Sequence, residues 1–133
     1  MRHRKTTGKL GRNMAQREAL MAGLVCNLIL AKRITTTLPK ARAAKRMADK
    51  MVTIGKRGTL ADRRRAVAKL KQPKAVEELF SAVSPAMADR NGGYTRIIKL
   101  GKRVSDSSEM CILEWVDYVP KAPEKSKKEK KDK

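Results

Sequence analysis

Side chains that can form a hydrophobic core are confined to residues 13–119, because both ends of the chain are basic and poor in apolar residues. The first twelve residues, MRHRKTTGKLGR, contain five Lys/Arg and no acid, and they offer little besides Leu10 to bury. Ordering twelve residues costs roughly 12–24 kcal/mol of backbone entropy, so this arm cannot fold without a partner. Residues 120–133 are rich in lysine and contain two prolines, which predicts disorder. We therefore expect one globular domain, residues 13–119, between a basic arm (1–12) and a lysine-rich tail.

The first two helices are predicted from apolar spacing and from their terminal residues. Asn13 can cap a helix over residues 13–31. Pro39 suits the first turn of a second helix, which runs to about residue 56 where Gly55 and Gly58 offer a stop. The inward positions expected from the spacing are Leu20, Met21, Leu24, Val25 and Leu28 in the first helix, and Ala41, Ala44, Ala48 and Met51 in the second.

Two further helices are predicted in the middle of the chain. Thr59 followed by Asp62 resembles a capping box that opens a third helix, and Pro73 starts a fourth. The expected inward residues are Leu60, Val67 and Leu70 in the third helix, and Val76, Leu79, Phe80 and Val83 in the fourth.

Three segments favour β-strands. RITTT (33–37) is a β-branched run, and TRIIKL (95–100) and MCILEWVDYV (110–119) form a hairpin around a polar loop. Cys111, Leu113 and Trp115 are favoured as its inward face, because Glu114 lies among the alternative residues. NGG (91–93), before the hairpin, is read as a turn, with a phosphate-binding backbone nest as the less favoured alternative. The expected fold is a small two-layer α/β (α+β) domain of order α-β-α-α-α-β-β, with a three-stranded sheet packed on helices.

The net charge of +20, from 33 Lys/Arg and 13 Asp/Glu, indicates a polyanionic partner. Residues 1–58 carry 15 basic and 2 acidic side chains, so the first half provides most of the basic surface. Aromatic residues make up only 3% of the chain, which favours contacts to phosphates over stacking on bases. The RRR run at 63–65 sweeps about 200° around a helix, so its members cannot share one partner surface, and a solvated face is as good an interpretation as RNA contact.

Other classes of function find little support. Cys26 and Cys111 are too far apart for a zinc-binding pair and are expected to be buried, inert thiols. No nucleophile, base and orienting group, phosphate-loop consensus or metal cluster is present, so we expect no catalysis, cofactor or small-molecule substrate. The apolar run ALMAGLVCNLILA (19–31) imitates a secretory signal, but Arg17 and Glu18 adjoin it and it is short for a membrane helix.

Four motifs, MRHRK at the start, LGRN before the first helix, RITTTLPKAR (33–42) and RNGGYTRI (90–97), closely resemble the family of the seventeenth protein of the bacterial large ribosomal subunit. The resemblance covers residues 1–119. It implies a cytoplasmic, ribosomal protein that binds 23S ribosomal RNA near the outer end of the peptide exit tunnel, beside other large-subunit proteins and away from membranes. The RNA-binding residues expected on this basis are Arg2, His3, Arg4, Lys5, Arg12 and Arg17 in the arm and first helix, and Arg33, Lys40 and Arg96 in the other motifs. Lys9 of the basic arm and Arg42 of the second helix are expected to bind RNA as well.

A DNA-architectural protein is the rival from another class, since it would share the charge and the lack of catalytic residues. It should show a helix-turn-helix, an apolar wedge or a dimerisation seam. ITTTLP (34–39) separates the first two helices where a tight turn to a recognition helix would be needed.

Overall fold

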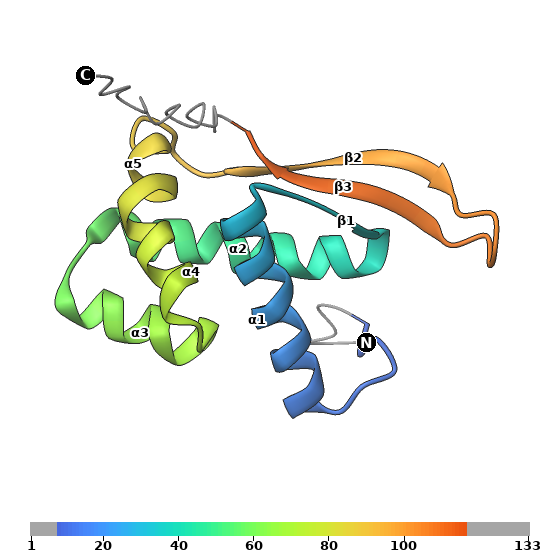
Figure 1. Ribbon diagram of the computed structural model, residues 1–133, viewed down its shortest axis with the longest axis horizontal. Coiled ribbons are helices and arrows are strands. Elements are labelled where there is room, and N and C mark those ends of the chain that lie inside the picture. Colours follow the sequence, from blue (N-terminus) through green and yellow to red (C-terminus); the bar gives the residue numbers. More distant parts are fainter. Residues whose placement is uncertain (1–7, 117–133) are drawn as a thin grey trace, which may run out of the picture.

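The computed structural model describes residues 8–116, which form helices beneath a small sheet (Figure 1). The four arm residues Arg2, His3, Arg4 and Lys5, and the tail 120–133, lie outside the described residues. Residues 73–86 make one continuous helical segment, so the expected order α-β-α-α-α-β-β is confirmed. In chain order, the elements are α1 (Met14–Ala31), β1 (Arg33–Thr37), α2 (Leu38–Arg57), α3 (Leu60–Leu70), α4 (Pro73–Glu78), the π-helical η1 (Leu79–Val83), α5 (Ser84–Ala86), β2 (Thr95–Lys102) and β3 (Glu109–Trp115).

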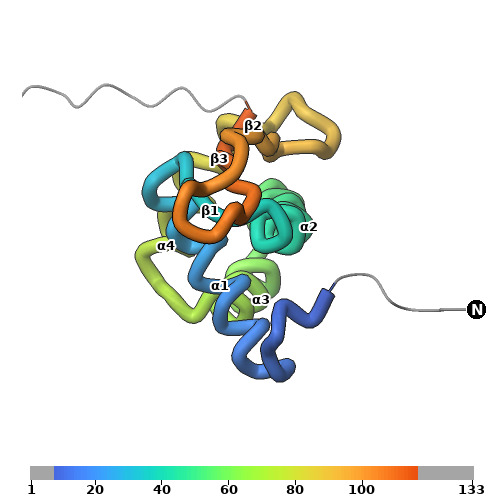
Figure 2. The backbone as a smooth tube through the Cα atoms, turned by 90° about the vertical axis from the view of Figure 1, so that its right-hand side faces the viewer, coloured from blue at the N-terminus to red at the C-terminus, as the bar shows by residue number. Residues whose placement is uncertain are grey.

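The sheet is antiparallel, with β3 between β1 and β2. Cys111, Leu113 and Trp115 of β3 are buried, which confirms the predicted inward face of the hairpin. The helices cover this face, and Figures 1 and 2 show that no described helix lies over the other face. The core is mainly aliphatic, and it extends from the inner face of the sheet through α1 and α2 to α3, α4 and η1.

The start of α1 was predicted correctly, but of its five expected inward residues only Val25 and Leu28 are fully buried. The side chain of Asn13 accepts a hydrogen bond from the backbone N–H of Gln16 (2.9 Å). The Gln16 side chain in turn accepts a hydrogen bond from the backbone N–H of Asn13, which completes a capping box. The fully buried positions are Ala22, Val25, Cys26, Leu28 and Ile29, whereas Leu20, Met21 and Leu24 are only partly buried. The stripe is displaced because α1 contacts α2, α3, α4 and β1 together, which spacing within one helix cannot reveal.

Helix α1 is long and apolar enough to cross a membrane by length and composition, and it is the one such helix among the described residues. Its buried side chains belong to the core of the domain, where they pack against other helices and β1. The apolar residues of α1 that imitate a signal sequence are therefore explained by their packing in the core of the domain.

The buried face of α3 is also displaced from the predicted one, and of its three expected inward residues only Leu70 is buried. Leu60 and Val67 are 65% and 47% exposed, and the buried positions are Asp62, Ala66 and Leu70. Thr59 caps the helix by accepting from the N–H of Asp62 (3.1 Å) and donates its hydroxyl to the Asp62 carboxylate (2.7 Å). A carboxylate satisfied in this way can turn inward, so the helix packs through its small Ala66 face.

Gly58 ends α2 in the left-handed conformation (φ 67°), as predicted, but Gly55 lies inside the helix. A Cβ built on Gly55 would lie 1.9 Å from Oγ and 3.0 Å from Cβ of Ser84, at the start of α5. Gly55 is therefore a close-packing position between two helices.

We expect Gly55→Ala to lower the free energy of unfolding by about 1–3 kcal/mol, because the overpacking outweighs the better helix propensity of alanine. Gly23→Ala is the matched control, since Gly23 is an exposed glycine of α1 with nothing within 4 Å, and it should stabilise by up to about 1 kcal/mol. Adding Ser84→Ala should restore much of the stability, since it removes the nearest clashing atom. Urea unfolding of the four proteins measures this, and equal effects of the two glycine substitutions would contradict the packing role.

Candidate nucleic-acid interface

The most regular basic surface of the described residues lies along α2. Its inner face is set by Ala41, Ala44, Ala48, Met51 and Val52, whose mostly small side chains allow close packing on the core. At 100° per residue, the exposed residues Arg42, Arg46, Lys50 and Arg57 share the opposite face. We call these four residues the α2 stripe; it spans about 22 Å of helix, which is long enough to follow several phosphates.

A groove between α1, α2 and α3 runs along one side of the α2 stripe. Five cationic side chains and a single carboxylate line it, so an anion approaching it meets a positive surface. The charged lining residues are Arg17, Glu18, Arg46, Lys50, Lys69 and Lys71.

A second groove lies on the other side of the α2 stripe. Leu10, Pro39 and Ile97 line it together with Arg42, Lys45, Arg46 and Asp49. Gly8 and Arg46 line both grooves, so the described end of the arm lies where the two grooves meet.

Residues 9–12 form a turn that joins the arm to α1. Leu10 and Gly11 have positive φ (55° and 63°), and the backbone N–H of Arg12 donates to the carbonyl of Lys9 (3.1 Å). The Arg12 guanidinium donates to the Leu10 carbonyl (2.9 Å), and Arg17 donates to the Arg12 carbonyl (3.3 Å). The structure thus brings Arg12 and Arg17 together, and both stay close to the backbone of the turn.

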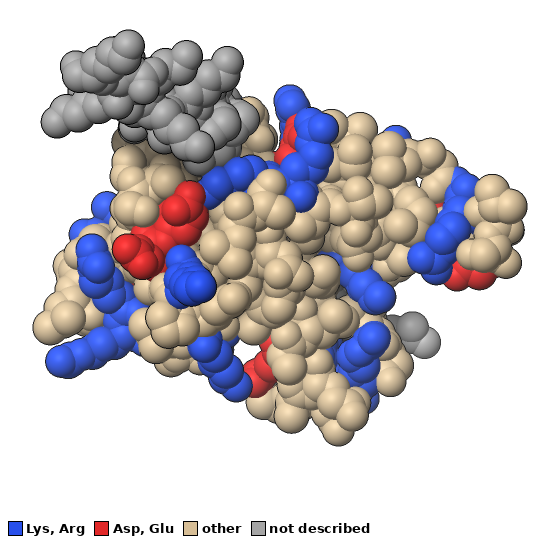
Figure 3. Space-filling view, in the orientation of Figure 1, with Lys and Arg blue, Asp and Glu red and all other residues tan. Residues whose placement is uncertain are grey.

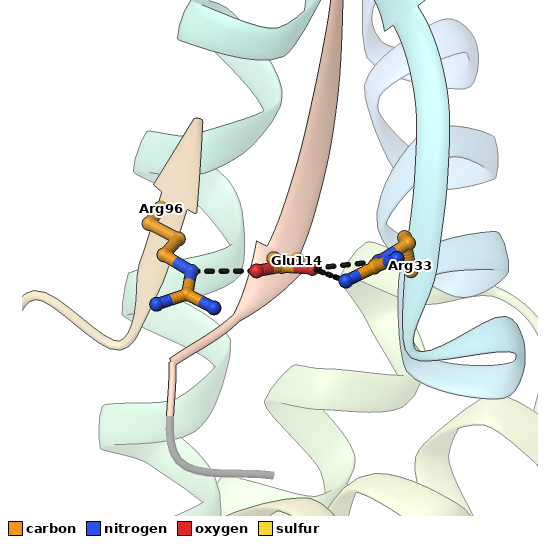
Figure 4. A network of polar contacts seen from close by, with 3 residues as sticks. All are labelled: Arg33, Arg96 and Glu114. Atoms are coloured by element: carbon orange, nitrogen blue, oxygen red, sulfur yellow. Dashed lines mark hydrogen bonds and ion pairs between the residues drawn. The ribbon is translucent and has the colours of Figure 1, made fainter. Parts of the chain in front are cut away.

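A second basic cluster lies on the uncovered face of the sheet. Arg33 on β1 and Arg96 on β2 both contact Glu114 on β3, the strand between them (Figure 4). Donation from Arg96, together with donation from Arg33, lowers the pKa of Glu114 against the opposing effect of burial, so the carboxylate stays charged. Arg33 and Arg96, 63 positions apart in sequence, thus form one cluster with Glu114, and the three side chains have a net charge of +1.

The RRR run behaves as its spacing predicts. Arg63 lies over the ring of Phe80 (4.9 Å to the centroid), and Arg65 contacts Asp62 of its own helix (3.4 Å). Two of the three arginines therefore have different local partners, which supports the solvated interpretation over a shared RNA contact.

Among the charged side chains on the face drawn in Figure 3, Lys and Arg cover more of the surface than Asp and Glu. Blue Lys and Arg extend from the helices to the tip of the hairpin, and each red acidic patch lies beside a blue one. At the hairpin tip this pairing holds Arg103 against Asp106 (2.6 Å), which lowers the pKa of the carboxyl.

Both cysteines are buried, as predicted. The Cys26 thiol donates to the Leu70 carbonyl and the Cys111 thiol to the Thr36 carbonyl, and burial raises the pKa of each. Over residues 8–116, no group of three or more His, Cys, Asp or Glu side chains could hold a metal ion.

Comparison with known protein families identifies a family whose sequence model covers most of the domain. The sequence model of the family described as ribosomal protein L17 matches residues 20–116, which include β1, α2 and the complete sheet. The chain belongs to the ribosomal protein L17 family. The resemblance read from the four sequence motifs is thereby confirmed.

Curated members of the L17 family are similar over almost the full chain. The large ribosomal subunit protein bL17 of Thermodesulfovibrio yellowstonii is 47% identical over 131 residues, 98% of each chain. That of Akkermansia muciniphila is 46% identical over 125 residues, 94% of this chain and 92% of the relative. That of Bacteroides fragilis is 47% identical over 118 residues, 89% of this chain and 73% of the relative.

Sequence reasoning missed several residues of this L17-family surface. Arg46 and Lys50 follow Arg42 at intervals of four, a spacing that could have identified the α2 stripe. Lys69 and Lys71 gave no such signal, because their position beside α1 depends on how three helices pack. Glu114 was interpreted only as an outward residue, and its two arginine partners become visible only with the strand order.

Proposed function

We propose that this L17-family chain is a structural component of the large subunit of the cytoplasmic ribosome, which binds and stabilises 23S ribosomal RNA and carries out no reaction. The observation that supports this most directly is the α2 stripe, flanked by two grooves whose charged linings are mainly basic. Relatives 46–47% identical over most of this chain are named as large ribosomal subunit proteins.

The mode of binding that we propose is contact with phosphates and with the shape of folded RNA. Over residues 8–116, Tyr94 and Trp115 are buried and Phe80 is half-buried beneath Arg63, so these rings offer little surface for base stacking. Lysine and arginine side chains on a rigid helix supply the alternative, since phosphate contacts release counterions and dominate affinity.

The resemblance also implies a position near the outer end of the peptide exit tunnel, with other large-subunit proteins as neighbours, and we include both in the proposal. Cross-linking of assembled subunits would identify those neighbours. The uncovered face of the sheet and the two grooves are separate surfaces, so RNA and a neighbouring protein could be bound at the same time.

Sedimentation tests the proposed function. When cell extracts are separated on a sucrose gradient, the full chain should sediment with large subunits and should remain there after a high-salt wash. The matched variant, with Arg42, Arg46 and Lys50 replaced by glutamine, should be released at lower salt, because fewer phosphates are neutralised. Recovery of the natural chain in the free or nucleoid fraction would contradict the ribosomal proposal, and recovery in the nucleoid fraction would favour the DNA-architectural rival.

A further inference from the structure

A single row of three charged residues crosses the uncovered face of the sheet. In the register, Glu114 pairs with Arg33 of β1 on one side and with Arg96 of β2 on the other. Figure 4 shows both guanidinium groups directed at the carboxylate between them. The next row on the same face, Thr35, Ile112 and Ile98, contains ordinary strand residues, so the fold itself does not demand charges here.

The three side chains differ sharply in their exposure. The Glu114 side chain is 6% exposed, whereas those of Arg33 and Arg96 are 62% and 56% exposed. One carboxylate oxygen accepts from Nε of Arg33 (2.6 Å) and contacts its Nη2 (2.5 Å), and the other accepts from Nε of Arg96 (2.5 Å). The carboxylate is thus covered and satisfied by the two arginines, which themselves face solvent.

The contacts of Glu114 occupy the inner edges of the two guanidinium groups. Arg96 contacts Glu114 through Nε alone, and within the described residues no partner is seen for its two terminal amino groups. Arg33 contacts Glu114 through Nε and Nη2, and no partner within the same residues is seen for its Nη1. Terminal amino groups of arginine suit the paired oxygens of a phosphate. An exposed arginine without a partner samples many rotamers, whereas contact with Glu114 restricts those of Arg33 and Arg96.

We propose that Glu114 is a positioning residue that holds Arg33 and Arg96 together as a preformed receptor for a phosphate of the RNA. The inference rests on the proposed function, because the family identity and the charge of +20 favour RNA over an acidic protein as the anion. Stability alone does not explain why three charged residues occupy this row of the sheet. A buried ion pair is often no more stabilising than apolar residues of similar size.

The decisive variant is Glu114→Gln, which keeps the size of the side chain and removes its charge. By net charge alone this variant should bind RNA more tightly, because the protein becomes more positive. If Glu114 positions the arginines, binding to deproteinised 23S ribosomal RNA should instead weaken by about three- to tenfold. Glu109→Gln is the matched control, since it makes the same charge change at an exposed position of the same strand and should bind as tightly as the natural chain or more so.

A second variant makes the test independent of the folding of Glu114→Gln. Arg33→Lys with Arg96→Lys keeps the net charge and removes the forked donors, so it should weaken RNA binding to a similar extent. Combining it with Glu114→Gln should cost little more, because both changes remove the same arrangement. Thermal unfolding of each variant corrects the binding data for the folded fraction.

Three outcomes separate the inference from the proposed function. Binding by folded Glu114→Gln as tight as by Glu109→Gln would overturn the positioning role and leave the proposed function intact. Weaker binding to poly-glutamate, with unchanged RNA binding, would assign the arginines to an acidic protein partner and would also overturn it. If the natural chain bound 23S RNA no better than duplex DNA, both proposals would fall.

Discussion

Replacing Trp115 with alanine is expected to lower the free energy of unfolding by about 3–5 kcal/mol, the typical cost of removing a large buried aromatic side chain. Trp115 is 3% exposed at the end of β3, and its Nε1 donates to the carbonyl of Leu28 near the end of α1 (3.1 Å). The same carbonyl accepts the backbone N–H of Lys32 (2.9 Å), where α1 ends and the chain turns into β1. The ring therefore joins the last strand to the last turn of the first helix.

Trp115→Phe is the matched control for this prediction. It keeps most of the ring and removes the N–H donor, so it should cost only about 1–2 kcal/mol. Domains of this size have a total stability of about 5–15 kcal/mol, so the alanine variant should lose a large fraction of it. Urea unfolding of the natural chain and both variants measures these values. A decrease below about 1 kcal/mol for Trp115→Ala would contradict this role.

Local signals predicted the limits of the elements well. Asn13, Thr59 and Gly58 act where they were expected, because a cap depends on hydrogen bonds and backbone angles within a few residues. Gly55 shows where this reasoning fails. In the sequence it offers a second helix stop, but its contact with Ser84 depends on a packing partner 29 positions away.

The buried faces of the helices were harder to predict than their existence. The second helix has an alanine row on one side and cations on the other, so its inner face follows from composition. In the first and third helices apolar residues occupy more than one face, and the neighbouring elements decide which of them are buried. Ala22 and Ile29 of α1 were missed for this reason, and Leu60 and Val67 of α3 were wrongly placed inside.

In the candidate site, too, features within one helix could be predicted from the sequence, whereas features that join distant segments could not. The α2 stripe could be predicted because intervals of four residues place side chains on one helical face. The placement of Arg33 and Arg96 on either side of Glu114 could not, because it requires β1 to pair with the free edge of β3. The sequence predicts the hairpin of β2 and β3 but not where β1 joins it. The roles of Arg2, His3, Arg4 and Lys5 remain predictions from the resemblance.

Deleting residues 2–12 is expected to have the largest effect on incorporation into large subunits while changing the stability of the free domain little. The deletion keeps Asn13, which caps α1, and the only partly buried apolar side chain it removes among the described residues is that of Leu10. It also removes five Lys/Arg and no acid. If most of the five find phosphates, the slope of log binding constant against log salt should fall by about 0.7–0.9 for each phosphate that is no longer neutralised.

The tail provides a control of nearly equal charge for this deletion. Residues 120–133 contain seven lysines and three acids, so their removal lowers the net charge by four, against five for the arm. A difference between the two deletions therefore reports where the charges lie more than how many there are. The described end of the arm lies at the meeting point of the two grooves beside the α2 stripe, so the arm's cations would extend that surface, whereas the tail follows β3 in the chain.

Sucrose-gradient sedimentation and salt titrations of 23S RNA binding should therefore distinguish the two deletions. Without the arm, incorporation and binding should fall strongly, because five cations next to the α2 stripe in the proposed RNA-binding surface are lost. Without the tail, both should fall only weakly. Equal effects of the two deletions would mean that the arm acts only through its charge, and a large drop in thermal stability on arm deletion would mean that it belongs to the folded domain.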